Sequence, residues 1–230
     1  IICFKKPINN LFKLTPKLKS LILHEPQTES FFTNNVYKLE FLLNLVINYY
    51  FTYKLNVLPI NIIKLCLHKG SYNITFSHFI NLKHLEISLL RNQHLDLSKT
   101  NITYVKCNLD YNSNIIFNNK IKYELLEIIA KDQINIQNVE TVVLNVKTSS
   151  YFVTIHNTYS SILVIKNKTK MISFPKKVKE LYFENMDMYS FSDLPDSVEK
   201  ISIFCYLQNK KLGSYPKNLK ELQIINLLTS

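Results

Sequence analysis

The apolar residues of the chain recur in a triplet, with two residues between its first and second members and one between its second and third. Successive triplets mostly start about 20 residues apart. A fixed period of this length is the sequence signature of a solenoid, in which each repeat forms one turn. The triplets are Leu18/Leu21/Leu23, Leu42/Leu45/Ile47, Ile62/Leu65/Leu67, Leu82/Leu85/Ile87, Ile102/Val105/Cys107, Val139/Val142/Leu144, Tyr159/Ile162/Val164, Val178/Leu181/Phe183, Val198/Ile201/Ile203 and Leu219/Leu222/Ile224.

Each triplet predicts one short β-strand. Its second and third members are two residues apart, so they lie on the same face of the strand. One short strand cannot bury this apolar row alone, but parallel strands stacked about 4.8 Å apart merge their rows into one core. Proline stands three residues before four of the triplets, where a fixed φ suits a turn. Because the chain has only 2 Gly, we expect the turns to use Asn, Asp and Ser.

Two stretches depart from the regular period. The gap between Ile102 and Val139 is nearly double, so a further turn is expected near Ile121, which makes ten to eleven turns in all. Residues 120–132 also carry apolar residues at helical spacing, which predicts a short helix on the outer side of the solenoid. Residues 24–41 lengthen another turn, and we expect them to form a surface loop. The residues at helical spacing are Ile121, Leu125, Ile128 and Ile129.

The triplets match the pattern L-x-x-L-x-L, and the chain therefore resembles the leucine-rich-repeat superfamily. The stretch "LPDSVEKISI", with Pro and Ser ahead of the strand, is most similar to irregular protist repeats of the FNIP type. The resemblance implies a single α/β solenoid over residues 1–230, a parallel sheet on its concave face, and irregular or short helical convex segments. We expect residues 1–230 to be a fragment of the solenoid that lacks its terminal caps.

The resemblance also implies a non-enzymatic module that recognises a protein partner through the concave strand face. In one form this is the substrate-recognition part of an adaptor. The outward strand positions are polar in the first half of the chain and become apolar from Val143 onward, which favours a contact site there. Two alternatives remain open: other parts of the chain cover these side chains, or a different register turns them inward. The candidate partner-binding residues are Val143, Leu163, Ile165, Tyr182, Phe204 and Ile225.

The formal net charge of +11 favours a second class of function, the binding of nucleic acid or an anionic membrane surface. However, Arg91 is the one Arg among 28 basic residues, and Arg is the residue that usually reads phosphate and bases. The lysines are also spread along the whole chain. We therefore expect them to solvate the surface, with Glu180, Lys200 and Glu221 side by side on adjacent strands, and we do not expect a nucleic acid partner.

No motif for catalysis emerges from the sequence. With only 2 Gly, the phosphate-binding and nucleophile-elbow motifs that need several glycines are excluded. The 4 Cys are widely separated, and the 6 His have no ligand spacing, so we expect no metal and no cofactor. Cys107 is expected to be a buried hydrophobe, whereas Cys66 lacks an assignable base. No apolar run is long enough for a transmembrane helix, and a cytoplasmic location is expected.

Overall fold

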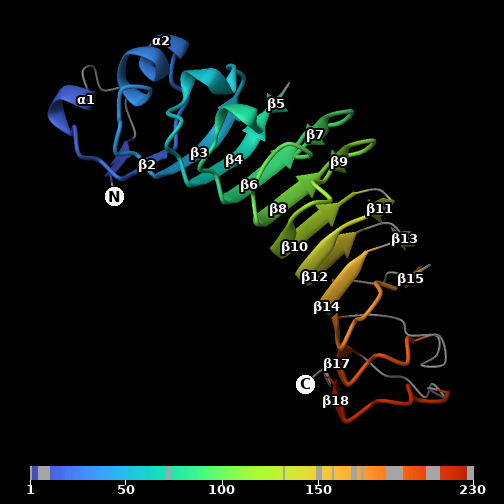
Figure 1. The fold of residues 1–230 in the computed structure, drawn as a ribbon. Helices are drawn as coiled ribbons and strands as arrows, with labels where there is room; N and C mark the ends of the chain where they lie inside the picture. The colour runs from blue at the N-terminus through green and yellow to red at the C-terminus, as the bar shows by residue number, and fades with distance from the viewer. Residues whose placement is uncertain are drawn as a thin grey trace. The chain divides into compact units, whose positions relative to one another are not determined.

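The computed structural model describes residues 2–4, 11–70, 74–131, 133–148, 152–156, 158–166, 170–171, 174–184, 194–205 and 213–226. These residues form a parallel β-solenoid that is mostly strand with little helix (Figure 1). The chain divides into two compact units, which we call unit 1 (Ile1–Asn118) and unit 2 (Asn119–Ser230). None of the helices formed by the described residues is long and apolar enough to cross a membrane.

Unit 1 contains two parallel sheets and several short helical segments. Its main sheet has the order β1 (Ile2–Phe4), β2 (Ser20–Leu23), β3 (Asn44–Phe51), β4 (Lys64–Gly70), β6 (His84–Leu89) and β8 (Tyr104–Leu109). Its second sheet has the order β5 (Ile74–Thr75), β7 (His94–Asp96) and β9 (Asn114–Ile116). The helical segments are α1 (Leu11–Leu14), α2 (Glu29–Phe31), a π-helical turn (Phe32–Val36) and two 3-10 turns (Leu55–Val57 and Phe76–His78).

The core of unit 1 confirms the five triplets predicted there. Their second members lie directly opposite one another on successive strands, and each is 0% exposed. Burying one such side chain stabilises the fold by about 2 kcal/mol, so the stack is held together mainly by this row. The row consists of Leu21, Leu45, Leu65, Leu85 and Val105.

Residues 24–41 do not form the surface loop that the sequence analysis expected. They fold into α2 and the π-helical turn, which bury Phe31 and Phe32 in the core. The ring of Phe32 packs edge-on against Phe51 of β3, with 5.1 Å between the ring centroids. Thr28 caps α2, since its side-chain oxygen accepts a hydrogen bond of 3.2 Å from the backbone N–H of Phe31. Phe31 and Phe32 therefore belong to the core, whereas Tyr37 and Phe41 of the same segment are exposed.

Asn residues replace Gly at several turns, as the low glycine content predicts. Asn92 and Asn112 follow β6 and β8 and have φ values of 62° and 57°. Asn138 in unit 2 has a φ of 55°. Asn tolerates this left-handed conformation better than most residues because its short side chain can bond to the local backbone.

Unit 2 repeats the two-sheet arrangement of unit 1. Its main sheet has the order β10 (Lys122–Ala130), β12 (Glu140–Thr148), β14 (Tyr159–Lys166), β16 (Glu180–Glu184), β17 (Lys200–Cys205) and β18 (Glu221–Asn226). Its second sheet has the order β11 (Ile134–Gln137), β13 (Phe152–His156) and β15 (Lys170–Met171).

The helix predicted for residues 120–132 is wrong, because this stretch forms strand β10. Its core residues are Tyr123, Leu126 and Ile128, which are at most 1% exposed and have the same spacing as the other triplets. The extra turn expected near Ile121 therefore exists, and its triplet begins two residues later. Pairing with β12 decides the outcome, because the ladder buries alternate residues whereas the helical spacing would bury a different set.

The triplets predicted for β12 and β14 are displaced, by two residues in β12 and by one in β14, and only the displacement in β14 exchanges the two faces. The inward positions of these strands are Thr141/Leu144/Val146 and Ser160/Leu163/Ile165, and all six residues are at most 2% exposed. A hydroxyl residue thus takes the first position of each triplet. Thr141 donates to the carbonyl oxygen of Val143 at 2.9 Å, and Ser160 donates to that of Ile162 at 2.7 Å. These bonds satisfy the buried hydroxyls, so polar residues are tolerated inside the solenoid.

The last three triplets show two outcomes. Those that start at Val178 and Val198 are fully buried, as predicted. In the final triplet, Leu222 and Ile224 are 37% and 41% exposed, although they lie opposite the buried Ile201 and Ile203. Among the residues that the structure describes the solenoid has about eight turns, where ten to eleven were expected. Segments 5–10, 185–193 and 206–212, each between two strands of the main sheets, lie outside the described residues.

Candidate functional site

The outward face of the unit 2 sheet carries a contiguous apolar cluster. Leu125, Val143 and Ile162 lie directly opposite one another on β10, β12 and β14. In the next row, Val164 of β14 lies opposite Tyr182 of β16. All five side chains point away from the core and are half-buried. We call these five residues the unit 2 patch.

The structure divides the six predicted partner-binding residues into three groups. Val143 and Tyr182 belong to the unit 2 patch. Phe204 and Ile225 are also half-buried and lie opposite each other on β17 and β18, but in a third row that Lys147, Lys166 and Glu184 occupy on the preceding strands. Leu163 and Ile165 are 0% exposed and belong to the core, so their predicted place on the surface is wrong.

The error at Leu163 and Ile165 has a simple origin in the sequence. Residues 162–165 read Ile-Leu-Val-Ile, so an alternation of apolar and polar residues is absent at this point. Either register would place apolar side chains in the core, and pairing with the neighbouring strands selects one of them. The outward residues that the sequence analysis missed are therefore Ile162 and Val164. The only local signal was Ser160, which matches Thr141 as a hydroxyl residue in the first position of its triplet.

Paired charges border the unit 2 patch. The Nζ of Lys122 lies 3.4 Å from Glu140 Oε1, and that of Lys200 lies 2.9 Å from Glu221 Oε1. Glu180, Lys200 and Glu221 are aligned across adjacent strands, as predicted. The hydroxyl of Tyr182 donates to Glu180 Oε2 at 2.7 Å, and this hydrogen bond raises the pKa of the tyrosine. The bond fixes the polar end of Tyr182 while its ring stays beside Val164.

A shallow groove opens at the edge of unit 2 where β10, β12 and β14 start. Its volume is about 320 Å³, and its walls include Lys122, Glu140 and Lys177. The Nζ atoms of Lys176 and Lys177 lie 5.7 and 5.4 Å from the ring centroid of Tyr159, within the range of cation–π attraction. The groove therefore combines an aromatic ring with a local excess of positive charge.

The corresponding face of unit 1 carries a cluster of polar residues centred on Glu86. Glu86 Oε1 lies 3.0 Å from Lys64 Nζ and accepts a hydrogen bond of 2.8 Å from His84 Nε2. The imidazole of His84 stacks on Tyr104, with 3.8 Å between the ring centroids. Burial tends to raise the pKa of Glu86, but its bonds to His84 and Lys64 outweigh burial and lower it to about 2. Glu86 is thus held as a carboxylate.

Cys66 lies beside this cluster, directly opposite Glu86 on the neighbouring strand. Its side chain is on the outward side of the sheet but is only 3% exposed. Burial and the adjacent Glu86 raise the pKa of the thiol to about 12, so it stays protonated at neutral pH. Burial also lowers the pKa of His84, an effect that Glu86 partly offsets. The geometry therefore brings a thiol, an imidazole and a carboxylate together without activating the thiol.

The remaining candidate residues for chemistry are dispersed. Cys107 is 0% exposed in the core, as predicted for a small hydrophobe, and burial raises its pKa. His68 is exposed and lies in a different row from His84. The Nε2 of His84 is hydrogen-bonded to Glu86. Within the described part of the chain, no group of three or more His, Cys, Asp or Glu residues is placed to hold a metal ion.

Comparisons with protein-family models, with curated proteins and with solved structures found no match for the chain. The resemblance to leucine-rich repeats of the FNIP type therefore stays a prediction.

Proposed function

We propose that the chain is a non-enzymatic recognition module that binds a protein partner through the unit 2 patch. The observation that carries this proposal is that Leu125, Val143 and Ile162 are contiguous on the outward face of three adjacent strands. Strand spacing sets these side chains about 5 Å apart, so they form one apolar surface. Soluble proteins seldom leave such a surface without a use, because covering it with a partner releases water favourably.

The surroundings of the patch support a protein partner. Interface centres are typically apolar and aromatic with a polar rim, and tyrosine is enriched among the residues that contribute most to affinity. Tyr182 stands beside the aliphatic residues with its hydroxyl already bonded to Glu180, so its ring is held in place before binding. The Lys122–Glu140 and Lys200–Glu221 pairs lie at the rim, where charges contribute to specificity more than to affinity.

The proposal has a finer form, which rests on the resemblance of the repeat to leucine-rich repeats. In this form the module is leucine-rich-repeat-like, acts in the cytoplasm, and serves as the substrate-recognition part of an adaptor. A role as an enzyme is disfavoured because the residues around Cys66 hold its thiol protonated. A role in binding nucleic acid is disfavoured because several strand lysines pair with carboxylates of the next strand, as Lys64, Lys166 and Lys200 do.

The test compares two matched double variants of the whole chain. Val143→Ser with Ile162→Ser removes the centre of the patch, whereas Ile22→Ser with Val46→Ser changes an equivalent outward pair on β2 and β3 of unit 1. Partners are identified by cross-linking and mass spectrometry, and the affinity of each purified partner is then measured. We expect the first variant to lose at least about tenfold in affinity and the control to lose less than about twofold.

Thermal unfolding of both variants checks that the fold is retained. The proposal is wrong if a partner binds both variants as tightly as it binds the unchanged chain. It is also wrong if the affinity of the first variant falls only in proportion to its unfolded fraction.

A further inference from the structure

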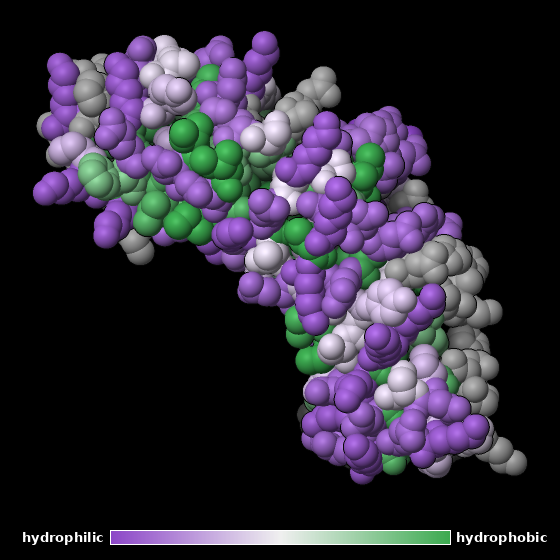
Figure 2. Space-filling model, in the orientation of Figure 1, coloured by the Kyte–Doolittle hydropathy of each residue, from purple (hydrophilic) through white to green (hydrophobic). Residues whose placement is uncertain are grey.

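Unit 1 exposes a row of large apolar side chains at the edge where its main-sheet strands begin. Ile80 is 68% exposed, Phe41 52%, Ile60 42% and Ile63 41%. Figure 2 shows apolar residues over this edge, at the starts of β2, β3 and β4, with hydrophilic residues around them. Together with the half-buried Leu43, these four residues form what we call the unit 1 edge strip. It is separate from the unit 2 patch, and its function is a separate question.

Backbone hydrogen bonds link neighbouring turns that carry the strip. The N–H of Ile63 donates to the carbonyl of Leu43 at 2.8 Å, and the N–H of Lys83 donates to the carbonyl of Ile63 at 2.9 Å. On the other side, the N–H of Leu43 donates to the carbonyl of Lys19 at 3.0 Å. A second row runs beside the first, where the side chain of Asn61 donates to the carbonyl of Glu40 at 3.2 Å. Leu43 and Ile63 are therefore adjacent on neighbouring turns, and a lysine stands at each end of their row.

The local sequence leaves no inward position for these side chains. The core residues of the same turns are Leu42, Ile62 and Leu82, each at most 1% exposed. Residues directly beside an inward position of a strand or turn point away from it. The repeat therefore explains why Phe41, Ile63 and their neighbours are exposed. It does not explain why the residues at these exposed positions are apolar.

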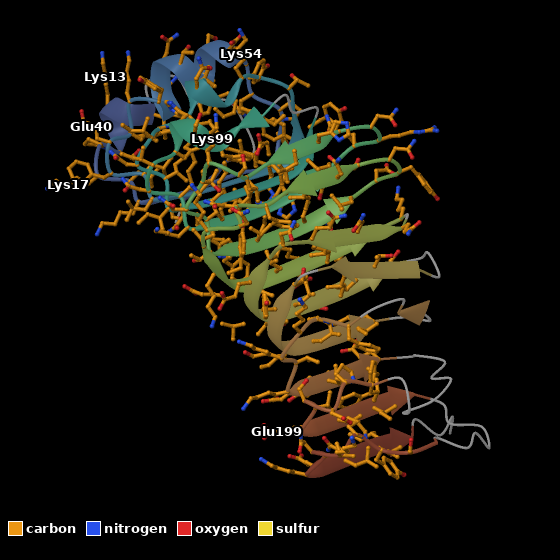
Figure 3. All side chains as sticks on the ribbon, turned by 45° about the vertical axis from the view of Figure 1, so that its right-hand side comes forward. Lys13, Lys17, Glu40, Lys54, Lys99 and Glu199 are labelled. Carbon is orange, nitrogen blue, oxygen red and sulfur yellow. The ribbon has the colours of Figure 1, made fainter. Side chains whose placement is uncertain are left out.

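The charges around the strip are mostly positive. The exposed charged residues of this edge are four lysines and one glutamate, a net charge of 4 − 1 = +3. Figure 3 shows Lys17 and Glu40 at this edge of unit 1. Among the residues that the structure describes, neither Lys17 nor Lys19 forms an ion pair with a carboxylate. The charged residues are Lys17, Lys19, Lys38, Lys83 and Glu40.

Residue types distinguish a lipid surface from a protein as the partner of this strip. Protein interfaces are enriched in Tyr, Trp, Phe, Met and Arg and depleted in Lys. The strip has Ile and Phe bordered by Lys and Asn, and none of its residues is Tyr, Trp or Arg. Apolar side chains at exposed turns, combined with lysines, suit an anionic membrane, because the apolar groups enter the boundary of the acyl chains while the lysines contact the headgroups.

We propose that the unit 1 edge strip docks this protein peripherally onto an anionic lipid bilayer. Ile80 and Phe41 enter the interface, since they are the most exposed residues of the strip, and Ile60 and Ile63 follow. Lys17, Lys19 and Lys83 neutralise lipid phosphates and carboxylates at its ends. Neither signal suffices alone, because a few aliphatic side chains or a few lysines give only weak membrane binding.

The first experiment measures partition of the whole chain onto vesicles. Phosphatidylcholine vesicles with about 30% phosphatidylserine are compared with phosphatidylcholine alone, and we expect at least about tenfold stronger binding to the former. Ile63→Ser with Ile80→Ser should lower binding to the anionic vesicles at least about tenfold. Lys17→Gln with Lys19→Gln should lower it by a similar factor. Ile116→Ser is the matched control, because Ile116 is 51% exposed on β9 and lies outside the strip.

The second experiment locates the inserted residue. The chain contains 0 Trp, so a single introduced tryptophan reports on its own surroundings. We expect the emission of an Ile80→Trp variant to shift to shorter wavelength on anionic vesicles, and that of an Ile116→Trp variant to stay unchanged.

Three outcomes would overturn the membrane proposal: no binding of the unchanged chain to anionic vesicles, equal binding of the Ile63/Ile80 variant, or equal emission shifts at both tryptophans. A strip that joins two copies of the chain would instead appear as a molecular mass, measured by light scattering, that falls in the Ile63/Ile80 variant. That result would also overturn it. The unit 2 patch plays no part in these measurements, so either proposal can fail while the other stands.

Discussion

The outward faces of the two units are built on the same strand geometry but present different chemistry. In unit 1 the face from β4 onward is occupied by Lys64, His84, Glu86 and Tyr104, which bond to or stack on one another. In unit 2 the equivalent rows begin with Leu125, Val143 and Ile162, which lie opposite one another, and the row continues with Glu180. A polar face of this kind is satisfied within the molecule, whereas an apolar one gains from a partner. The outward face of unit 1 is thus stabilised by contacts within the molecule, whereas the outward face of unit 2 offers a surface to a partner.

The largest expected effect concerns the thiol of Cys66 in unit 1. Because its pKa is raised from 9.0 to about 12, its thiolate fraction at pH 8 is lower by about a thousandfold than that of an ordinary cysteine. We expect alkylation of Cys66 to be slower by at least this factor in the folded chain than in urea, as measured by mass spectrometry of the labelled peptide. If Cys66 is alkylated as fast in the folded chain as in urea, its thiol is not buried by the polar face of unit 1.

The second prediction tests the register that defines the unit 2 patch. Leu163→Ala removes a side chain that is 0% exposed and should lower the free energy of unfolding by about 3 kcal/mol. Ile162→Ala changes its neighbour on the outward face and should cost less than about 1 kcal/mol. Urea unfolding of the two variants measures both values. Equal losses, or the reverse order, would mean that β14 presents its other face to the core.

The third prediction concerns the contribution of Glu86 to the stability of unit 1. Glu86→Gln keeps the shape of the side chain but leaves Lys64 without its carboxylate, and we expect a loss of about 1 kcal/mol after allowance for the partial exposure of the pair. The folded-state pKa of Glu86 is lowered from 4.5 to about 2. Its contribution is therefore complete above pH 4.5 and is lost as the pH falls toward about 2.

Urea unfolding of the unchanged chain and of Glu86→Gln across this pH range checks the sign of the effect. The two stability curves should differ at pH 6 and converge near pH 2. A difference that grows as the pH falls would contradict the ion pair.

The smallest effect is expected from polyanions. If the lysines mainly solvate the surface and pair with carboxylates, heparin should release the chain below about 0.15 M salt, and RNA should bind with little preference for sequence. Chromatography on heparin with a salt gradient measures this. Retention well above that concentration would favour the nucleic acid alternative over recognition through the unit 2 patch.

The repeat itself was predictable, and the faces of the strands were predictable only in part. In β6, β8 and β17 a polar residue (Glu86, Lys106 or Ser202) stands between the inward residues and fixes their face, and the structure confirms these triplets. In β10, β12 and β14 one outward row is apolar as well (Leu125, Val143 and Ile162), so the triplet has no unique register. Pairing with adjacent strands then decides, and this information is not local. The same property that makes the unit 2 patch a candidate site therefore made its residues hard to assign.

The candidate site shows the same limit. Val143 and Tyr182 were found because the inward positions of Leu144, Leu181 and Phe183 were predicted correctly. Ile162 and Val164 were exchanged for Leu163 and Ile165. The polar cluster of unit 1 was missed because its members are ordinary residues that lie two to forty positions apart in the sequence. Only the stacking of turns brings Lys64 and Cys66 opposite His84 and Glu86.

The run of four apolar residues at Ile162–Ile165 also has a consequence for refolding. A slip of one residue in β14 would still turn apolar side chains toward both faces, so hydrophobicity alone resists it little. The slip would, however, break the bond from the Ser160 hydroxyl to the Ile162 carbonyl and misalign the pairs with β12 and β16. An early mispaired β14 would be a kinetic trap, which the chain leaves only by unzipping this strand and pairing it anew.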